Sequence, residues 1–175
     1  MMSRNIALAG LIASVVVAVL PASGRAADKS KFQITSSVIS DGATIPTQFT
    51  CSGADKSPPL SWSGIPSNTK SLALLVEDPD APVGTFVHWV VYDVRPSSQG
   101  FDEGAVDGKE GANGMGRSGY MGPCPPPGKP HRYHFRLFAL DTNLNLEPNP
   151  NAQTVHDAMD GHILESADLV GIFER

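Results

Sequence analysis

Two apolar runs of strand length, joined by a connection rich in proline and aspartate, constrain the fold of this chain more than any other feature. The first run, Leu72–Val76, is apolar at every position, which is typical of a strand buried on both faces. The connection, Asp78-Pro-Asp-Ala-Pro82, breaks this strand at the surface, and the second run, Phe86–Asp93, contains His88. Because buried ionisable groups need partners, this arrangement favours a functional cleft. The structural alternative is a turn aspartate that caps its own backbone, beside a hydrogen-bonded core histidine.

Strand patterns also make up most of the remaining chain. They cover Lys31–Ile39, the short extended segment Ala43–Phe49, Leu60–Trp62 and His131–Asp141. The 15 prolines and 17 glycines among the 175 residues favour many turns and argue against a helical bundle. A chain of this length can bury a core as one domain. The sequence therefore predicts a single domain that is mainly antiparallel β.

The C-terminal part adds one or two short helices. Asn149-Pro-Asn151 opens a predicted helix over Ala152–Asp160, and Gly161 is well placed to end it. The following segment, Ile163–Phe173, can be read as a helix or as a last strand. Its bulky apolar end favours the strand.

A long segment from Arg95 to Pro130 has neither strand nor helix periodicity. It is rich in glycine and contains a cluster of prolines, Pro123 and Pro125–Pro127. A loop of this length inside a compact domain is uncommon unless it is functional or disordered. Because it directly precedes the strong strand pattern at His131, we expect it to fold over a site.

The N-terminus has the three regions of a secretory signal peptide. Arg4 precedes an apolar run over residues 6–20, and small residues follow, ending in Gly24-Arg-Ala26. The apolar run is shorter than the roughly 20 residues that span a bilayer, so we expect cleavage after Ala26 and no stable membrane span. An uncleaved anchor is the alternative. Residues 1–26 are thus the predicted signal peptide, residues 27–175 the mature domain, and the expected location is periplasmic or secreted.

Removal of the signal peptide makes the chain more acidic. The full sequence has 13 Lys and Arg against 18 Asp and Glu, and residues 1–26 hold two basic residues, Arg4 and Arg25, and no acidic one. Subtracting two from 13 leaves 11 basic against 18 acidic residues, a net charge of −7 with neutral histidines. Such a surface disfavours nucleic acid and anionic lipid, so an anion site must be a local pocket.

The two cysteines, Cys51 and Cys124, form an even pair in a chain that we expect to be exported. Oxidising compartments favour disulfides, so a bridge between them is predicted. Two buried free thiols are the alternative.

Several polar residues fall near the ends of the predicted core strands. They are Asp78, His88 and, on one face of the later strand, His131 and Tyr133. Side chains alternate along a strand, so His134 should point to the opposite face. An aspartate can fix the tautomer of a neighbouring histidine, and two imidazoles with a phenol supply donors without a permanent positive charge. This set suits a small oxyanion such as a phosphate monoester headgroup.

Metal-binding and catalytic interpretations stand beside this one. Asp78, His88 and His131 could supply one oxygen and two nitrogens to a metal ion. Either His131 or His88 could act as the general base of a hydrolase. The sequence has no G-x-S-x-G motif, and neither a nucleophile nor a metal motif is evident. We therefore expect binding, not catalysis, and no cofactor.

Two motifs around these residues resemble the signatures of the phosphatidylethanolamine-binding protein (PEBP) family, in particular its bacterial Raf-kinase-inhibitor-like branch. The first is Asp78-Pro-Asp-Ala-Pro82 with His88-Trp89, and the second is Gly122-Pro-Cys-Pro-Pro126 with His131-Arg-Tyr133. Three further segments are similar to stretches usual in bacterial members: Phe49-Thr-Cys-Ser-Gly53, Ser57-Pro-Pro-Leu-Ser-Trp62 and Gly161-His-Ile-Leu164. The resemblance runs from about Phe32 to Arg175.

The resemblance implies a PEBP-like fold, a large antiparallel sheet packed with smaller sheet elements around a pocket for phosphate-like anions. The residues that fall on pocket positions of the family motifs are Asp78, His88, Gly122, Pro126, His131 and Tyr133, and Asp80 is expected to shape the rim.

An exported protein that binds a small phosphate-type anion or a phospholipid headgroup is the function that this resemblance implies. The alternatives are a protein–protein regulator acting through the pocket rim and a His-dependent hydrolase. An exported chain does not meet a cytosolic kinase of its own cell, so kinase inhibition is not carried over. We expect a monomer or homodimer, with a possible protein partner.

Overall fold

The structure is a computed structural model that describes residues 31–175, and the predicted signal peptide at residues 1–26 lies outside this part. One helix, α1 (Ala152–Met159), and a short 3-10 turn, η1 (Thr47–Phe49), accompany nine strands. The strands are β1 (Gln33–Thr35), β2 (Ala43–Thr44), β3 (Leu60–Ser63), β4 (Ser71–Asp78), β5 (Phe86–Val94), β6 (Gly100–Phe101), β7 (Lys109–Glu110), β8 (His131–Leu140) and β9 (Ile163–Phe173). The prediction of a mainly β protein is confirmed.

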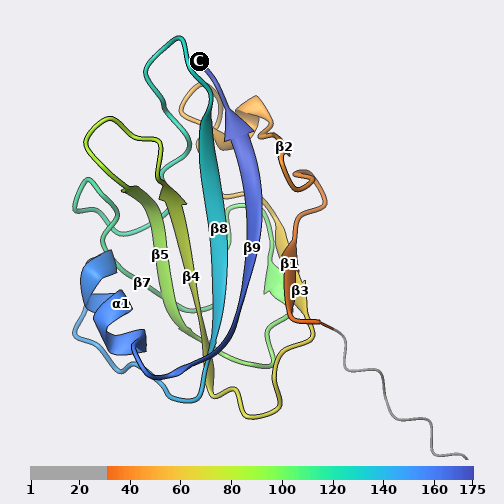
Figure 1. The fold of residues 1–175 in the computed structure, drawn as a ribbon, viewed down its shortest axis with the longest axis vertical. Coiled ribbons are helices and arrows are strands. Elements are labelled where there is room, and N and C mark those ends of the chain that lie inside the picture. Colours follow the sequence, from red (N-terminus) through yellow and green to blue (C-terminus); the bar gives the residue numbers. More distant parts are fainter. Residues whose placement is uncertain (1–30) are drawn as a thin grey trace, which may run out of the picture.

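Six of these strands form one large sheet in the order β2-β9-β8-β4-β5-β7. The four long strands β9, β8, β4 and β5 lie side by side at its centre (Figure 1). Neighbouring strands are antiparallel except for β2 and β9, which pair in parallel at Ala43↔Gly171 and Thr44↔Ile172. The large sheet is therefore antiparallel with one short parallel pair at its edge.

The central strand β4 is buried along its whole length because both faces of the large sheet are covered. On one face, the small sheet β1-β3-β6 completes the main core, which includes Ile34, Trp62, Leu74, Trp89, Phe101 and Phe135. On the other face, α1 closes a second core with Ala73, Leu75, Val90, Val155 and Met159. Burial on both faces explains why the first apolar run shows no polar alternation.

The C-terminal elements follow the sequence pattern closely. The Asn151 side chain caps α1 by accepting a hydrogen bond of 2.9 Å from the backbone N–H of Thr154. Gly161 follows the helix with a φ of 75°, a left-handed conformation that glycine adopts readily. The segment Ile163–Phe173 is a strand that pairs with β8, so the strand interpretation is confirmed and the helical one is wrong.

Two N-terminal strands are shorter than predicted. The strand expected over Lys31–Ile39 is limited to the three residues of β1. The extended segment expected over Ala43–Phe49 consists of the two-residue β2 followed by η1. Pro46 stands directly before η1 as its N-cap residue, and proline has no N–H to extend a strand ladder.

The segment between β5 and β8 is largely irregular, as its sequence predicts. Its regular elements are the two-residue strands β6 and β7. Within residues 31–175, no helix is long and apolar enough to cross a membrane.

Candidate functional site

A small cavity lies where β4 ends and where β5 and β8 begin. These ends meet because β4 is antiparallel to both neighbours. The cavity volume is about 190 Å³, below the roughly 300–1,000 Å³ of typical drug-sized pockets. Its floor consists of three buried polar residues from the strands, Asp78, His88 and His131. Its walls are mainly apolar and come largely from loops: Ala81, Pro82, Val83, Phe86, Met115, Met121, Cys124, Pro125 and Pro126.

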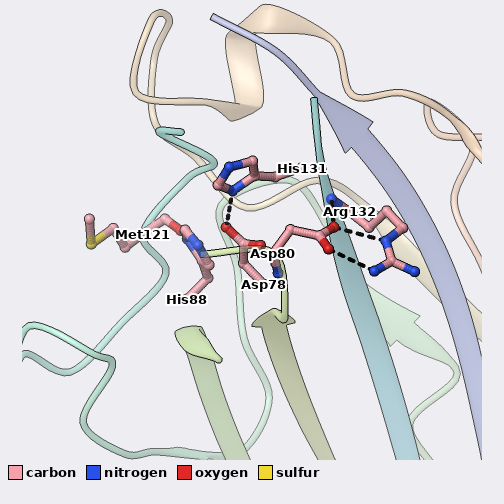
Figure 2. A network of polar contacts seen from close by, with 6 residues as sticks. All are labelled: Asp78, Asp80, His88, Met121, His131 and Arg132. Atoms are coloured by element: carbon pink, nitrogen blue, oxygen red, sulfur yellow. Dashed lines mark hydrogen bonds and ion pairs between the residues drawn. The ribbon is translucent and has the colours of Figure 1, made fainter. Parts of the chain in front are cut away.

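Asp78 fixes the ring of His131 at the cavity floor. Nδ1 of His131 lies 2.7 Å from Oδ2 of Asp78 (Figure 2). Because a carboxylate accepts, Nδ1 carries the proton and donates it, which leaves Nε2 as the free ring nitrogen. Oδ1 of Asp78 accepts a hydrogen bond of 2.8 Å from the backbone N–H of Asp80. Asp78 thus caps its own turn and also orients His131.

Asp80 anchors the rim of the site to the start of β8. Its carboxylate accepts three hydrogen bonds from Arg132: from Nη2 at 2.7 Å, from Nε at 2.8 Å and from the backbone N–H at 3.0 Å. The side-chain bonds, followed by the backbone bond, hold the pKa of Asp80 well below its usual range. Asp80 does not line the small cavity. It lines an open neighbouring cleft together with Lys129 and Arg132.

His88 is held from the loop side of the cavity. Its Nδ1 lies 2.7 Å from the carbonyl oxygen of Met121, so Nδ1 donates, and the Gly122 carbonyl also lies against the ring. Burial of the ring lowers the pKa of His88, and the hydrogen bond to the Met121 carbonyl opposes this shift only partly. The ring packs edge-on against Phe86 and Tyr133, with centroid distances of 4.9 and 5.1 Å. His88 is therefore a neutral imidazole near pH 7.

Tyr133 supports the floor from below and does not line the cavity. It is fully buried, and burial raises the pKa of its hydroxyl. Among the described residues, this hydroxyl has no hydrogen-bond partner. A buried unpaired donor is unusual in a folded protein.

The loop Gly122–Pro127 forms one wall. Pro126 lines the cavity, whereas Gly122 lies behind it. The N–H of Gly122 donates to Oδ1 of Asp55 at 2.7 Å. A Cβ atom at Gly122 would lie 2.5 Å from that oxygen and 2.7 Å from the carbonyl oxygen of Phe49. The close approach of these two loops therefore requires glycine.

The predicted disulfide between Cys51 and Cys124 is confirmed. The two Cα atoms lie 5.4 Å apart and the residues are 73 positions apart in sequence. Cys124 also lines the cavity, so the bridge connects the cavity wall to the loop after η1. The alternative of two free thiols is wrong.

Comparison with known families identifies the fold. The family model described as phosphatidylethanolamine-binding protein matches residues 35–174. The chain belongs to the phosphatidylethanolamine-binding protein (PEBP) family.

Curated relatives match most of this PEBP-family chain. A UPF0098 protein of Methanothermobacter thermautotrophicus is 47% identical over 142 residues, which cover 77% of this chain and 93% of the relative. A UPF0098 protein of Pyrococcus horikoshii is 40% identical over 174 residues, covering 94% of this chain and 87% of the relative.

Two solved PEBP-family structures share the fold. One is a putative PEBP homolog, CT736, from Chlamydia trachomatis, with a TM-score of 0.79 and 42% identity over 82% of this chain and 97% of that chain. The other is E. coli YbcL, described as a member of the mammalian PEBP family, with a TM-score of 0.77 and 31% identity over 82% of this chain and 98% of that chain.

The opposite face of β8 carries a second His–Asp pair outside the PEBP cavity. Nδ1 of His134 lies 2.7 Å from Oδ2 of Asp168, and neither residue lines the cavity. The structure therefore places His131 and His134 on the opposite faces that strand alternation predicts.

The metal interpretation of Asp78, His88 and His131 is not supported by the geometry. Among residues 31–175, no group of three or more His, Cys, Asp or Glu side chains is arranged to hold a metal ion. Asp78 instead uses its two oxygens on His131 and on the backbone of Asp80.

Some residues of the PEBP site were not found by sequence reasoning. Arg132 pairs with Asp80 across 52 positions of sequence, and the Met121 carbonyl reaches His88 across 33. The apolar wall residues, such as Phe86 and Met115, also belong to no sequence pattern that would identify them as lining a cavity. The one available signal is their position, since Arg132 stands inside the second motif and Met121 directly precedes it.

Proposed function

We propose that this protein is exported and binds a small phosphate-type anion or a phospholipid headgroup in the cavity at the ends of β4, β5 and β8. The observation that carries the proposal is the pair of buried imidazoles, His88 and His131. Both rings line the cavity. His131 donates from Nδ1 to Asp78, which leaves its Nε2 for a ligand. The family description, which names phosphatidylethanolamine, supports this choice of ligand class.

The size of the cavity favours a headgroup over a whole lipid. A volume of about 190 Å³ equals that of about six water molecules at roughly 30 Å³ each. A phosphate with a few attached atoms fits this space, whereas the remainder of a phospholipid would have to stay outside. The apolar walls exclude water and so strengthen polar contacts at the floor.

A protein partner at the rim is the second candidate function. Val83 and Met115 line the mouth and are 93% and 59% exposed. Exposed apolar groups at one site are a feature of interaction surfaces. A partner that covers this mouth would compete with a ligand for the cavity.

Hydrolysis has weaker support. The His131–Asp78 pair has the arrangement of a general base with its orienting carboxylate. However, no serine or threonine is among the described residues that line the cavity, and Cys124 is in the disulfide. We therefore propose binding as the function.

Two variants on the same strand test the proposal in calorimetric titrations with inorganic phosphate and with O-phosphoethanolamine. His131→Ala and His134→Ala each remove a ring whose Nδ1 lies 2.7 Å from an aspartate oxygen, so the loss of a His–Asp pair is matched. Only His131 lines the cavity. We expect His131→Ala to weaken binding by on the order of 1–3 kcal/mol, because a ligand oxygen loses its partner, and His134→Ala to leave affinity unchanged. Equal losses, or none in either variant, would contradict the proposal.

The two ligands in this experiment separate the possible sources of the anion. Tighter binding of phosphoethanolamine than of phosphate indicates that the site also contacts the ethanolamine part and therefore recognises a headgroup. Equal affinities indicate a phosphate site.

A further inference from the structure

We propose that the Cys51–Cys124 disulfide is a redox-sensitive cross-link that orders the cavity wall, Gly122–Pro127. Its reduction by a dithiol makes this wall more mobile and weakens ligand binding. The ligand part of this inference rests on the proposed function. The ordering of the wall does not, and it can be measured without any ligand.

The bridge holds the wall at Cys124, directly after the hydrogen bonds that connect the two loops. On the N-terminal side of Cys124, hydrogen bonds connect the two loops: the N–H of Cys51 donates to the carbonyl of Pro123 at 3.1 Å, and Gly122 donates to Asp55 at 2.7 Å. On the C-terminal side, residues 125–127 are all proline. Proline has no N–H, so these three residues cannot donate a backbone hydrogen bond.

Beyond the bridge, the wall has no backbone donor before Gly128. The next regular element is β8, which begins at His131. Pro125 and Pro126 both line the cavity; Pro125 is buried by packing, whereas Pro126 is exposed. The disulfide is the covalent contact that holds this stretch beside the loop after η1.

The bridge is open to a reductant. Cys51 is exposed and Cys124 is half-buried. Nη1 of Arg175 lies 3.5 Å from Sγ of Cys124, and a neighbouring guanidinium favours a thiolate at that sulfur. Cys124 is therefore the better leaving group when Cys51 is attacked.

The reaction is a thiol–disulfide exchange with a dithiol as the two-electron reductant. A thiolate of the dithiol attacks Sγ of Cys51, the Cys51–Cys124 bond breaks, and Cys124 leaves as a thiolate. The second thiolate of the dithiol then attacks the mixed disulfide and releases Cys51. The dithiol is oxidised to its disulfide, and its two protons end on the two cysteine thiolates.

Reduction should weaken ligand binding without unfolding the floor of the cavity. The floor keeps its strand positions, and the Met121 carbonyl still accepts from His88 at a point three residues before the bridge. If the released wall is in its bound arrangement in about one molecule in ten, the apparent Kd rises about tenfold.

Amide hydrogen exchange of oxidised and dithiothreitol-reduced protein tests the wall directly. Residues 125–127 have no amide hydrogen, so the amides next to the bridge report on the wall. We expect exchange at Cys51 and Gly122, which donate to Pro123 and Asp55 across the two loops, to become at least tenfold faster on reduction, and exchange in the β4 peptide, residues 71–78, to stay unchanged. The double variant Cys51→Ser/Cys124→Ser should match the reduced protein and show no response to dithiothreitol. Unchanged exchange at Cys51 and Gly122 would overturn the inference. Faster exchange in β4 as well would also overturn it, because the bridge would then hold the fold and not the wall.

Titration with O-phosphoethanolamine tests the consequence for binding. We expect a Kd about tenfold higher for the reduced protein and for the double variant, and full recovery on reoxidation of the wild type only. Equal affinity of the oxidised and reduced forms contradicts redox control. If the oxidised protein binds neither phosphoethanolamine nor phosphate, the proposed function fails, and hydrogen exchange still decides whether the bridge orders the wall.

Discussion

The two histidines at the cavity floor differ in the acceptor that each one meets. Nδ1 of His131 donates to a carboxylate, whereas Nδ1 of His88 donates to a neutral carbonyl. A nearby negative charge compensates for a positively charged ring, and a carbonyl in a buried environment does so far less. The two rings therefore stand in different electrostatic surroundings, and burial favours the neutral form of His88 by lowering its pKa.

The lowered pKa of His88 predicts a loss of stability in acid. Burial disfavours the charged ring in the folded protein, whereas the unfolded chain can protonate it below the ordinary value of about 6.5. The unfolded state then binds more protons, so the free energy of unfolding decreases as pH falls below about 6.5 and levels off at the folded pKa. Urea denaturation from pH 7.5 to pH 5 should show this decrease in the wild type.

The variant His88→Gln isolates the contribution of this ring to the acid response. We expect its free energy of unfolding to change less between pH 7.5 and pH 5 than that of the wild type. Identical slopes in the wild type and the variant would show that His88 is not the responsible group.

Strand alternation was the strongest residue-level signal in the sequence. It placed His131 on one face of β8 and His134 on the other, as the structure has them. The partners of the floor residues could not be predicted in this way. The bonds from Arg132 to Asp80 and from His88 to Met121 depend on which strand ends and loops meet in space, and local periodicity contains no such information.

The last two residues of β4, Glu77 and Asp78, point to opposite faces of the large sheet. Asp78 reaches the cavity, whereas its neighbour Glu77 points to the face covered by α1. There, the buried Glu77 carboxylate accepts from Arg136 and from His156, each at 3.2 Å. Two adjacent acids thus have partners because alternation sends them to opposite sides.

The loop contact at Gly122 predicts a defect that is specific to the site. A Cβ atom in Gly122→Ala would overlap Asp55 and Phe49 atoms at 2.5 and 2.7 Å, so the cavity wall must shift. We expect the variant to bind phosphoethanolamine on the order of tenfold more weakly and to lose roughly 1–3 kcal/mol of stability, as for other overpacked positions. Titration and urea denaturation measure the two effects.

Gly108→Ala is the matched control for this crowding. A Cβ atom at Gly108 would lie 2.8 Å from a Val94 methyl carbon and 2.9 Å from a Val91 methyl carbon, away from the cavity-lining residues. It should lower stability and leave affinity unchanged in the folded protein. Normal binding by Gly122→Ala would show that the wall does not depend on this loop contact.

Long elements were predictable from the sequence and very short ones were not. The apolar runs of β4 and β5, the pattern of β8 and the capped helix α1 each have enough residues to show a period. The strands β2, β6 and β7 have two residues each, too few for any period. They form because long-range packing brings their backbones beside β9, β3 and β5.

At the scale of the molecule, the family resemblance carried most of the fold prediction. The paired motifs led to the PEBP fold, and the match over residues 35–174 confirms the family. The parallel pair at the edge of the large sheet, β2 with β9, joins segments far apart in the sequence and has no counterpart in the sequence pattern. Assignment to the Raf-kinase-inhibitor-like branch remains a prediction.

Export is the remaining prediction at this scale, and it concerns the chain outside the described residues. The basic, apolar and small-residue regions of residues 1–26 predict a mature chain that starts near Ala27. N-terminal sequencing of protein recovered from the periplasm or the medium should give this start. Recovery of protein that begins at Met1 would contradict export by cleavage.

The cavity has a floor built from strands and walls built mainly from loops, and this division has a consequence for how such a cavity can diverge. The histidines and Asp78 are fixed by the sheet, and changes to them disturb the core. The wall residues lie mostly on loops, which accept substitutions and insertions more readily. Descendants of one ancestral sequence could therefore keep the same polar floor and acquire different ligand preferences through their loops alone, so relatedness in this fold need not imply a shared ligand.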